Sequence, residues 1–141
     1  MALRNFSDVT VGDELPERVF TLGRGDLVNY AGVVGDPNPI HFSDHIVKMI
    51  GMDDVIAQGM LTMSLGQNFI IDWLGDPAAL KDYTVRFTSP AYVPASERAV
   101  LVYQGKVKSL DPETKTGTIL MTVKQGDRKI FGKPMATVQF A

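Results

Sequence analysis

Residues 59–74 read Gly-Met-Leu-Thr-Met-Ser-Leu-Gly-Gln-Asn-Phe-Ile-Ile-Asp-Trp-Leu and form the longest helical candidate in the chain. Their apolar side chains cover most of the circumference of a helix, which is typical of a helix buried in a core. Gly75, Asp76 and Pro77 follow directly and predict the end of the helix. We therefore expect one long, buried helix that the remaining elements cover.

The second half of the chain alternates apolar and polar residues, as half-buried strands do. A sheet that curls around one long helix hides the apolar surface of both, and this arrangement is the hot-dog fold, an α+β architecture. We expect this fold, with the last strands forming long edges that pair in a dimer. Strands are predicted at residues 15–22, 83–88, 97–110, 116–125 and 129–140.

The composition indicates a single globular domain spanning residues 1–141. Cysteine is absent, which excludes disulfides, thiolate metal sites and a cysteine nucleophile. The net charge of −2 and the scattered Lys and Arg residues argue against nucleic acid as a partner. Residues 60–74 are too short and too polar for a membrane span, and residues 1–8 lack a signal-peptide hydrophobic region, so we expect a soluble, cytoplasmic protein.

The residues suited to chemistry lie within the stretch 30–60. Asp36 and His41 are separated by five positions in Asp-Pro-Asn-Pro-Ile-His. A fully extended chain would hold them up to roughly 17 Å apart, so they share a substrate only if the loop folds back. A carboxylate and an imidazole in one loop are the groups that general acid–base catalysis uses, and we predict that Asp36 and His41 form such a pair.

The loop between these two residues contains the means to fold back. Pro37 and Pro39 restrict their own φ angles and those of the residues before them. Asn38, between the prolines, is suited to hydrogen-bond to the loop backbone. We expect Asn38 and Pro39 to support the loop, between short helices predicted at residues 26–33 and after Ser43.

Gly59 is expected at the first position of the long helix, where its amide has no partner within the helix. Because glycine has no Cβ, a ligand can approach the backbone closely there. A carbonyl oxygen on that amide would gain a hydrogen bond and the field of the helix dipole. Such an oxyanion donor typically contributes on the order of 3 kcal/mol to lowering a barrier.

Each of these residues also has a purely structural interpretation. An Asp in a Gly-Asp-Pro loop is usually a turn former, and a lone His at a helix start is usually a cap or a surface residue, as we expect for His45. Gly59 alone fits a tight turn, and the apolar helix residues fit a core better than an acyl pocket. The functional interpretation rests on the occurrence of Asp36, His41 and Gly59 together within residues 36–59.

The stretch 30–60 resembles the hydratase motif of MaoC-like dehydratases and (R)-specific enoyl-CoA hydratases. The similar residues are Tyr30-Ala31, Gly35-Asp36-x-Asn38-Pro39-Ile40-His41, Gly51 and Ile56-Ala57-Gln58-Gly59-Met60. Other segments are similar to the catalytic subunits of the heterodimeric (3R)-hydroxyacyl-acyl carrier protein dehydratases of mycobacterial-type fatty acid synthase II. These segments are Asp26-Leu27-Val28-Asn29-Tyr30, Trp73-Leu74-Gly75-Asp76-Pro77 and Val85-Arg86-Phe87-Thr88.

The resemblance implies a hot-dog fold with an overhanging active-site segment, Asp36 and His41 as catalytic residues, and the Gly59 amide as oxyanion donor. It implies dehydration of (3R)-3-hydroxyacyl thioesters to trans-2-enoyl thioesters in fatty acid or mycolic acid elongation, on acyl carrier protein or CoA. It implies no metal and no organic cofactor. It further implies a heterodimer with a second hot-dog subunit that lacks the motif, with a homodimer as the alternative.

The chain departs from its relatives at four positions. Val34 replaces a common Ser or Thr, Gln58 replaces a His of some relatives, Ser43 replaces a common Asp or Asn, and Gln67 replaces a serine of some homodimeric hydratases. Three alternatives to the dehydratase are a homodimeric (R)-specific enoyl-CoA hydratase, a hot-dog thioesterase and a non-catalytic acyl-binding subunit. Thioesterases typically lack this Asp/His loop, and a binding subunit has no need of the pair.

Overall fold

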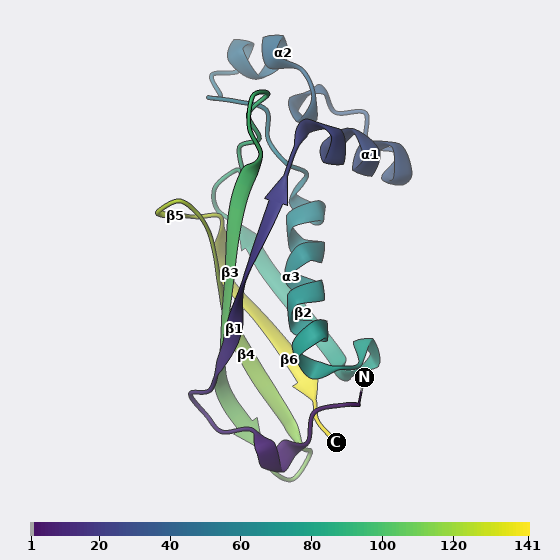
Figure 1. Cartoon of the computed structure of the whole chain (residues 1–141), viewed down its shortest axis with the longest axis vertical. Coiled ribbons are helices and arrows are strands. Elements are labelled where there is room, and N and C mark those ends of the chain that lie inside the picture. The colour runs from purple at the N-terminus through teal and green to yellow at the C-terminus, as the bar shows by residue number, and fades with distance from the viewer. Residues whose placement is uncertain (1) are drawn as a thin grey trace.

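The computed structural model describes residues 2–141 and shows a long helix lying in the curve of an antiparallel sheet (Figure 1). This confirms the predicted α+β hot-dog architecture. The helices are α1 (Arg24–Val34), α2 (Asp44–Met49) and α3 (Gly59–Leu74), with short 3-10 turns η1 (Phe6–Asp8), η2 (Pro39–His41) and η3 (Pro77–Ala79). The strands are β1 (Glu14–Leu22), β2 (Leu80–Phe87), β3 (Ala99–Asp111), β4 (Thr116–Gln125), β5 (Arg128–Lys129) and β6 (Phe131–Gln139).

The strand order of the sheet is β1-β3-β4-β6-β2, and β5 pairs with β4. The prediction that the last strands form the edges is therefore wrong, because β6 lies between β4 and β2 and the edges are β1 and β2. Alternation of side chains determines which face of a strand is buried, but it carries no information about which strand lies beside it. The predicted strand 129–140 is also divided, since Ile130 separates β5 from β6.

One face of α3 packs against the concave face of the sheet. Phe69, Ile70 and Leu74 of the helix are buried, and each such side chain stabilises the fold by about 1.5–3 kcal/mol. The Tyr103 hydroxyl of β3 donates to the Thr62 carbonyl of α3 at 2.8 Å, which ties the middle of the sheet to the first turns of the helix. The sheet residues beneath α3 include Leu101, Tyr103, Ile119, Val123 and Val138.

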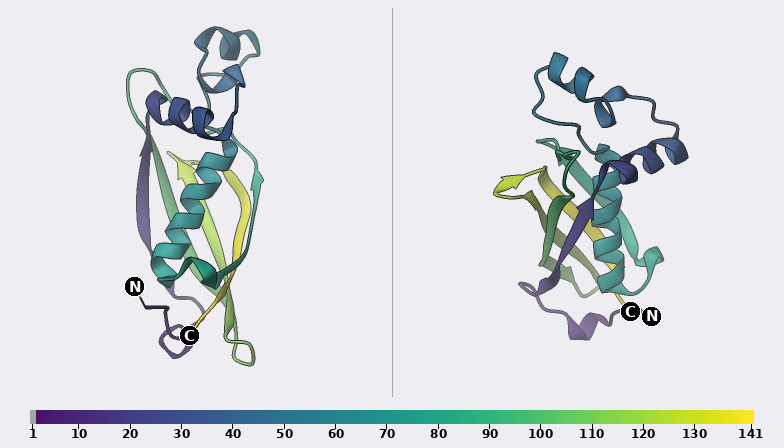
Figure 2. Two further views of the ribbon diagram at one scale, coloured as in Figure 1. Left: turned by 90° about the vertical axis from the view of Figure 1, so that its right-hand side faces the viewer. Right: turned by 45° about the horizontal axis from the view of Figure 1, so that its top comes forward.

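The opposite face of α3 is open in the single chain, so the expectation of a helix buried on all sides is wrong. Met60 is 57% exposed, and Gln67 and Asn68 are also exposed. The sheet curves around one side of the helix only, and the described residues place no second layer over the other side (Figure 2). None of the helices within residues 2–141 is long and apolar enough to cross a membrane.

The two ends of the chain lie together at the carboxyl end of α3 (Figure 1). Phe6 N–H donates to the Ala141 carbonyl at 3.2 Å, and Ala141 N–H donates to the Arg4 carbonyl at 3.0 Å. Arg4 in turn donates from its backbone N–H to the Leu74 carbonyl at 2.9 Å and from Nε to the Trp73 carbonyl at 3.0 Å. The last carbonyls of α3 therefore receive donors from the N-terminal segment.

Residues 24–57 form an overhang that projects beyond the far end of the sheet (Figure 2). The overhang contains α1, η2 and α2, and it leads directly into the first residue of α3. Gly35 ends α1 as predicted, with a left-handed φ of 70° and an N–H that donates to the Ala31 carbonyl. Ser43 caps α2 as predicted, since its side chain accepts a hydrogen bond from Ile46 N–H.

Gly66→Ala is expected to destabilise the fold because the Tyr83 phenol occupies the space beside Gly66. A Cβ at Gly66 would lie 2.2 Å from Tyr83 Oη and 3.2 Å from Met121 Cε. Glycine to alanine inside a helix ordinarily stabilises by about 1 kcal/mol, whereas overpacking costs about 1–3 kcal/mol. We expect urea denaturation to show a net loss of about 1 kcal/mol in the free energy of unfolding.

Two further variants isolate this contact. The Tyr83 hydroxyl is buried without a hydrogen-bond partner among the described residues, so Tyr83→Phe should cost little alone and should restore stability to Gly66→Ala. Gly32→Ala in α1 is the matched control, because its Cβ would meet no neighbouring atom within 4 Å, and it should stabilise. The proposed clash would be contradicted if Gly66→Ala and Gly32→Ala changed the free energy of unfolding equally. It would also be contradicted if the effects of Gly66→Ala and Tyr83→Phe were additive in the double variant.

Candidate functional site

The loop after α1 folds back through two successive side-chain hydrogen bonds. Asp36 Oδ1 accepts from Asn38 N–H at 3.1 Å, and Asn38 Oδ1 accepts from Ile40 N–H at 3.2 Å. Pro39 then begins η2, where a proline is favoured because its missing N–H is not needed. As a result Asp36 Oδ2 lies 3.4 Å from His41 Nε2. The structure thus brings together the carboxylate and the imidazole that the sequence placed five residues apart.

The His41 ring is 8% exposed and is oriented by a backbone group. Its Nδ1 lies 2.7 Å from the Ile56 carbonyl oxygen. Because a carbonyl oxygen only accepts, this hydrogen bond assigns the ring hydrogen to Nδ1. In that tautomer the lone pair of the ring lies at Nε2, toward the Asp36 carboxylate. A carboxylate and an imidazole placed this close together can both exchange a proton with one substrate, as general acid–base catalysis needs.

The Ile56 carbonyl is itself part of a short antiparallel ribbon formed by residues 55–57 and 91–93. Val93 N–H donates to the Val55 carbonyl and Ala57 N–H donates to the Ala91 carbonyl, both at 2.8 Å. Ile56 lies opposite the other strand's central residue in this ribbon, and its own N–H donates to the Ile40 carbonyl at 3.2 Å. Ile56, whose carbonyl is the partner of the imidazole, is therefore fixed by the 91–93 strand on one side and by Ile40 on the other.

Arg24 joins the pieces of the overhang. Its Nη2 lies 2.8 Å from Asp44 Oδ1 in α2 and 2.7 Å from Asp54 Oδ1, and its Nε donates to the Val93 carbonyl. The hydrogen bond from Arg24 holds the pKa of Asp44 below its ordinary value. These contacts fix α1, α2 and the 55–57/91–93 ribbon relative to one another.

A cleft of about 410 Å³ opens between the overhang and the sheet. His41 and Gly59 both line it, and most of the remaining lining is apolar, including Ile40, Met52, Ile56, Phe87, Ile130 and Phe131. Asp36 is not among the lining residues and borders the cleft through His41 Nε2. An apolar cleft with a few convergent polar groups is the usual form of a small-molecule site.

Gly59 is the first residue of α3, so the helix supplies no acceptor for its amide. Gln58 at the N-cap makes no side-chain capping bond, because its Nε2 donates instead to the Leu27 carbonyl at 2.9 Å. Leu61 N–H and Thr62 N–H donate to the Gln58 carbonyl, so the Gly59 and Met60 amides are the ones that stay available at the end that meets the cleft. A Cβ at Gly59 would lie 3.0 Å from the Phe87 ring, so this position admits no side chain without movement.

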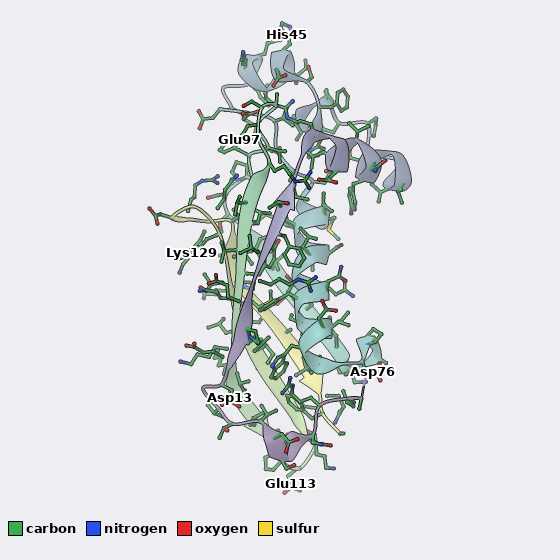
Figure 3. All side chains as sticks on the ribbon, viewed as in Figure 1. Asp13, His45, Asp76, Glu97, Glu113 and Lys129 are labelled. Carbon is green, nitrogen blue, oxygen red and sulfur yellow. The ribbon has the colours of Figure 1, made fainter. Side chains whose placement is uncertain are left out.

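Other titratable side chains take no part in this arrangement. His45 is exposed, as expected, and lies at the tip of α2 (Figure 3). Residues 2–141 contain no group of three or more His, Asp or Glu side chains placed to hold a metal ion. Burial raises the pKa of Tyr83, which packs under α3 outside the cleft.

Sequence reasoning missed two elements of the site. The Ile56 carbonyl is a backbone group, and no pattern of side chains marks it. Arg24 has partners 20 and 30 residues away. A signal for Arg24 was nevertheless present, because a cation in the first turn of a helix opposes the helix dipole and requires nearby carboxylates.

Comparison with protein families identifies one match, described as "MaoC like domain", over residues 8–125. The chain is 27% identical to the 3-hydroxybutyryl-CoA dehydratase of Methylorubrum extorquens over 128 residues, covering 89% of this chain and 78% of that protein. It is 34% identical over 100 residues to the mitochondrial 3-hydroxyacyl-[acyl-carrier-protein] dehydratase of Arabidopsis thaliana, covering 66% of this chain and 58% of that protein.

Solved structures give the same picture. A MaoC-like dehydratase superposes with a TM-score of 0.97 at 52% identity over 99% of this chain, which spans only 43% of that longer protein. An (R)-hydratase from A. caviae involved in PHA biosynthesis has a TM-score of 0.82 at 18% identity, with 94% and 98% of the two chains covered. The HadBC (3R-hydroxyacyl-ACP dehydratase) complex from Mycobacterium tuberculosis has a TM-score of 0.67 at 17% identity, with 90% and 94% covered. The last two likenesses support the fold alone.

Proposed function

Because the chain belongs to the MaoC-like domain family, we propose that it interconverts (3R)-3-hydroxyacyl thioesters and trans-2-enoyl thioesters by removing or adding water. The observation that carries this proposal is the 3.4 Å approach of Asp36 Oδ2 to His41 Nε2 beside a cleft that also contains Gly59. Membership in this family of dehydratases and hydratases makes the chain an enzyme of the hydro-lyase class. The apolar lining of the cleft suits an acyl chain.

In the proposed mechanism the thioester carbonyl accepts a hydrogen bond from the Gly59 amide. His41 Nε2 removes a proton from the α-carbon, and the negative charge moves to the carbonyl oxygen, where the amide and the helix dipole stabilise it. The electron pair then forms the double bond between the α- and β-carbons as the bond to the β-hydroxyl breaks. The Asp36/His41 pair returns a proton to the departing hydroxyl, which leaves as water. No other group is required for the atoms and charges to balance.

For the carrier, we propose acyl carrier protein and a role in fatty acid or mycolic acid elongation. Two observations support this choice: the resemblance of residues 26–30, 73–77 and 85–88 to the mycobacterial-type subunits, and the Arabidopsis relative, whose name specifies that carrier. The second candidate is an (R)-specific enoyl-CoA hydratase, which the Methylorubrum relative, a CoA dehydratase, favours. The ratio of kcat/KM values for one acyl chain presented on each carrier distinguishes the two.

Substitution of the acid–base pair provides the direct test of this function. Asp36→Asn and His41→Ala are each expected to reduce the rate of hydration of an enoyl thioester by roughly 10²–10⁴-fold, because each removes a proton-transferring group. The loss of absorbance of the conjugated enoyl thioester measures the rate. His45→Ala is the matched control and should retain full activity, since that ring is exposed on α2. Near-normal rates in both site variants would exclude the pair from the mechanism.

Gly59→Ala tests the oxyanion role, and the crowding by Phe87 must be separated from it. We expect kcat to fall about 10²-fold with a smaller change in KM, because the amide is proposed to stabilise charge that develops only in the transition state. Phe87→Leu alone is the control, and Gly59→Ala should also be measured in that background, where the added methyl group has room. A raised KM with unchanged kcat in the double variant would identify the amide as a binding contact instead.

We propose that a second hot-dog chain completes the molecule, as a heterodimer with a subunit that lacks the motif or, alternatively, as a homodimer. Two observations support an assembly. Strand β2 is an edge of the sheet next to the cleft, with no strand on its outer side among the described residues. Its last residue, Phe87, is 52% exposed, and Met60 in the first turn of α3 is 57% exposed. The HadBC structure among the fold neighbours is described as a complex.

Light scattering of the protein purified from its own host tests the assembly. The expected particle contains two hot-dog chains, and mass spectrometry of the co-purified band distinguishes a heterodimer from a homodimer. A stable monomer with full activity would show that no second chain is needed.

A further inference from the structure

The side-chain amide of Gln125, the last residue of β4, occupies the place of a neighbouring strand beside residues 91–93. Gln125 Oε1 accepts from Tyr92 N–H at 2.9 Å, and Gln125 Nε2 donates to the Tyr92 carbonyl at 2.7 Å. One side chain thus satisfies both backbone polar groups of Tyr92, as a paired strand would. The contact joins residues 33 positions apart in the sequence.

The 55–57/91–93 ribbon connects these hydrogen bonds to the His41 imidazole on its other side. In the ribbon, Tyr92 lies opposite Ile56, and each of these residues directs its own N–H and carbonyl away from the other. Tyr92 is bonded on its outer side by Gln125, and Ile56 is bonded on its outer side by Ile40 and by His41 Nδ1. We call this series of four residues the ladder: Gln125, Tyr92, Ile56 and His41. Tyr92 and Ile56 are joined through the hydrogen bonds of their flanking residues in the ribbon.

Arg128 of β5 fixes the orientation of the Gln125 amide. Its Nη2 donates to Gln125 Oε1 at 2.9 Å, its Nη1 donates to the Pro90 carbonyl, and its guanidinium lies 4.9 Å from the centre of the Tyr92 ring. Gln125 Oε1 accepts from both Tyr92 N–H and the Arg128 guanidinium. If the amide were rotated by 180°, its NH₂ group would face these two donors, and neither hydrogen bond could form. The short strand β5, which contains Arg128 and the Lys129 labelled in Figure 3, therefore fixes the Gln125 end of the ladder.

We propose that Gln125, held by Arg128, is a positioning residue for the general base His41. It sets the position of the Ile56 carbonyl, and through that carbonyl it keeps the ring hydrogen on Nδ1 and the lone pair of Nε2 directed toward Asp36 and the cleft. The kinetic part of this inference rests on the proposed function. A misplacement of the base on the scale of 1 Å can cost about 10²-fold in rate. Loss of the hydrogen bonds between Gln125 and Tyr92 should therefore reduce kcat by about 10–100-fold with little change in KM.

Gln125→Met and Gln125→Glu form the test pair. Methionine has nearly the same shape as glutamine but makes neither hydrogen bond to Tyr92. Glutamate keeps the acceptor for Tyr92 N–H and Arg128 while losing the donor, so it should restore part of the activity. Gln104→Met is the matched control, because Gln104 is an exposed residue of β3 and its side chain makes a hydrogen bond only to Glu17 among the described residues. Thermal melting confirms that each variant is folded.

The decisive readout is the imidazole signal in nitrogen-edited NMR, because it does not depend on turnover. The His41 Nδ1–H proton should be protected from exchange in the wild type and should shift upfield and broaden in Gln125→Met, since its bond to Ile56 lengthens. His45 is exposed and serves as the internal reference. In Gln104→Met the His41 signal and kcat should match the wild type.

The possible outcomes separate this inference from the proposed function. An unchanged His41 signal in folded Gln125→Met would overturn the positioning role, whatever the rates are. An equal fall of kcat in Gln125→Met and Gln104→Met would also overturn it. A wild-type protein that hydrates no enoyl thioester, but whose His41 signal responds to Gln125→Met, would refute the function and support the positioning.

Discussion

The packing of one face of α3 into the curve of the sheet sets the position and direction of the helix end that meets the cleft. Buried Phe69, Ile70 and Leu74 hold the helix axis, and the Tyr103 hydroxyl holds its first turns. The direction of the first free amides of α3 is therefore fixed by a core rather than by a loop. The overhang then needs only to bring one imidazole and one carboxylate to that end. The candidate site is thus divided between a rigid helix terminus and a loop, which is the arrangement that the proposed acid–base chemistry would use.

The elements with strong local signals were predicted well. The bounds 59–74 and 116–125 coincide with α3 and β4, because uninterrupted apolar or alternating patterns end there at glycines or turn residues. The approach of Asp36 to His41, and the support of the loop by Asn38, were predicted because these side chains lie within one short loop, where the distance they can span is small. In each case the deciding interactions are local, and local interactions are the ones that a single sequence records.

Features that depend on contacts between distant segments were not predicted. The strand order places β2 beside β6, and nothing in the alternation of either strand encodes that pairing. The outer face of α3 was expected to be buried because its apolar content was counted without knowing how far the sheet extends around it. The ladder from Gln125 to His41 uses the backbone of Tyr92 and Ile56, and backbone groups leave no trace in side-chain identity. Hydrogen bonds between segments far apart in the sequence are thus the features of this chain that its sequence did not predict.

The two ends of α3 differ in charge compensation, and this gives the cleft an electrical polarity. At the carboxyl end, Arg4 supplies a cation and two donors, so the negative pole of the helix is neutralised. At the amino end, Gln58 offers no cap, so the positive pole remains uncompensated toward the cleft. The helix therefore presents a partial positive charge to the cleft, while its negative end is compensated by Arg4. Its field favours ligands that carry or gain negative charge and disfavours cationic ones, and no Lys, Arg, Asp or Glu among the residues that line the cleft contributes to this preference.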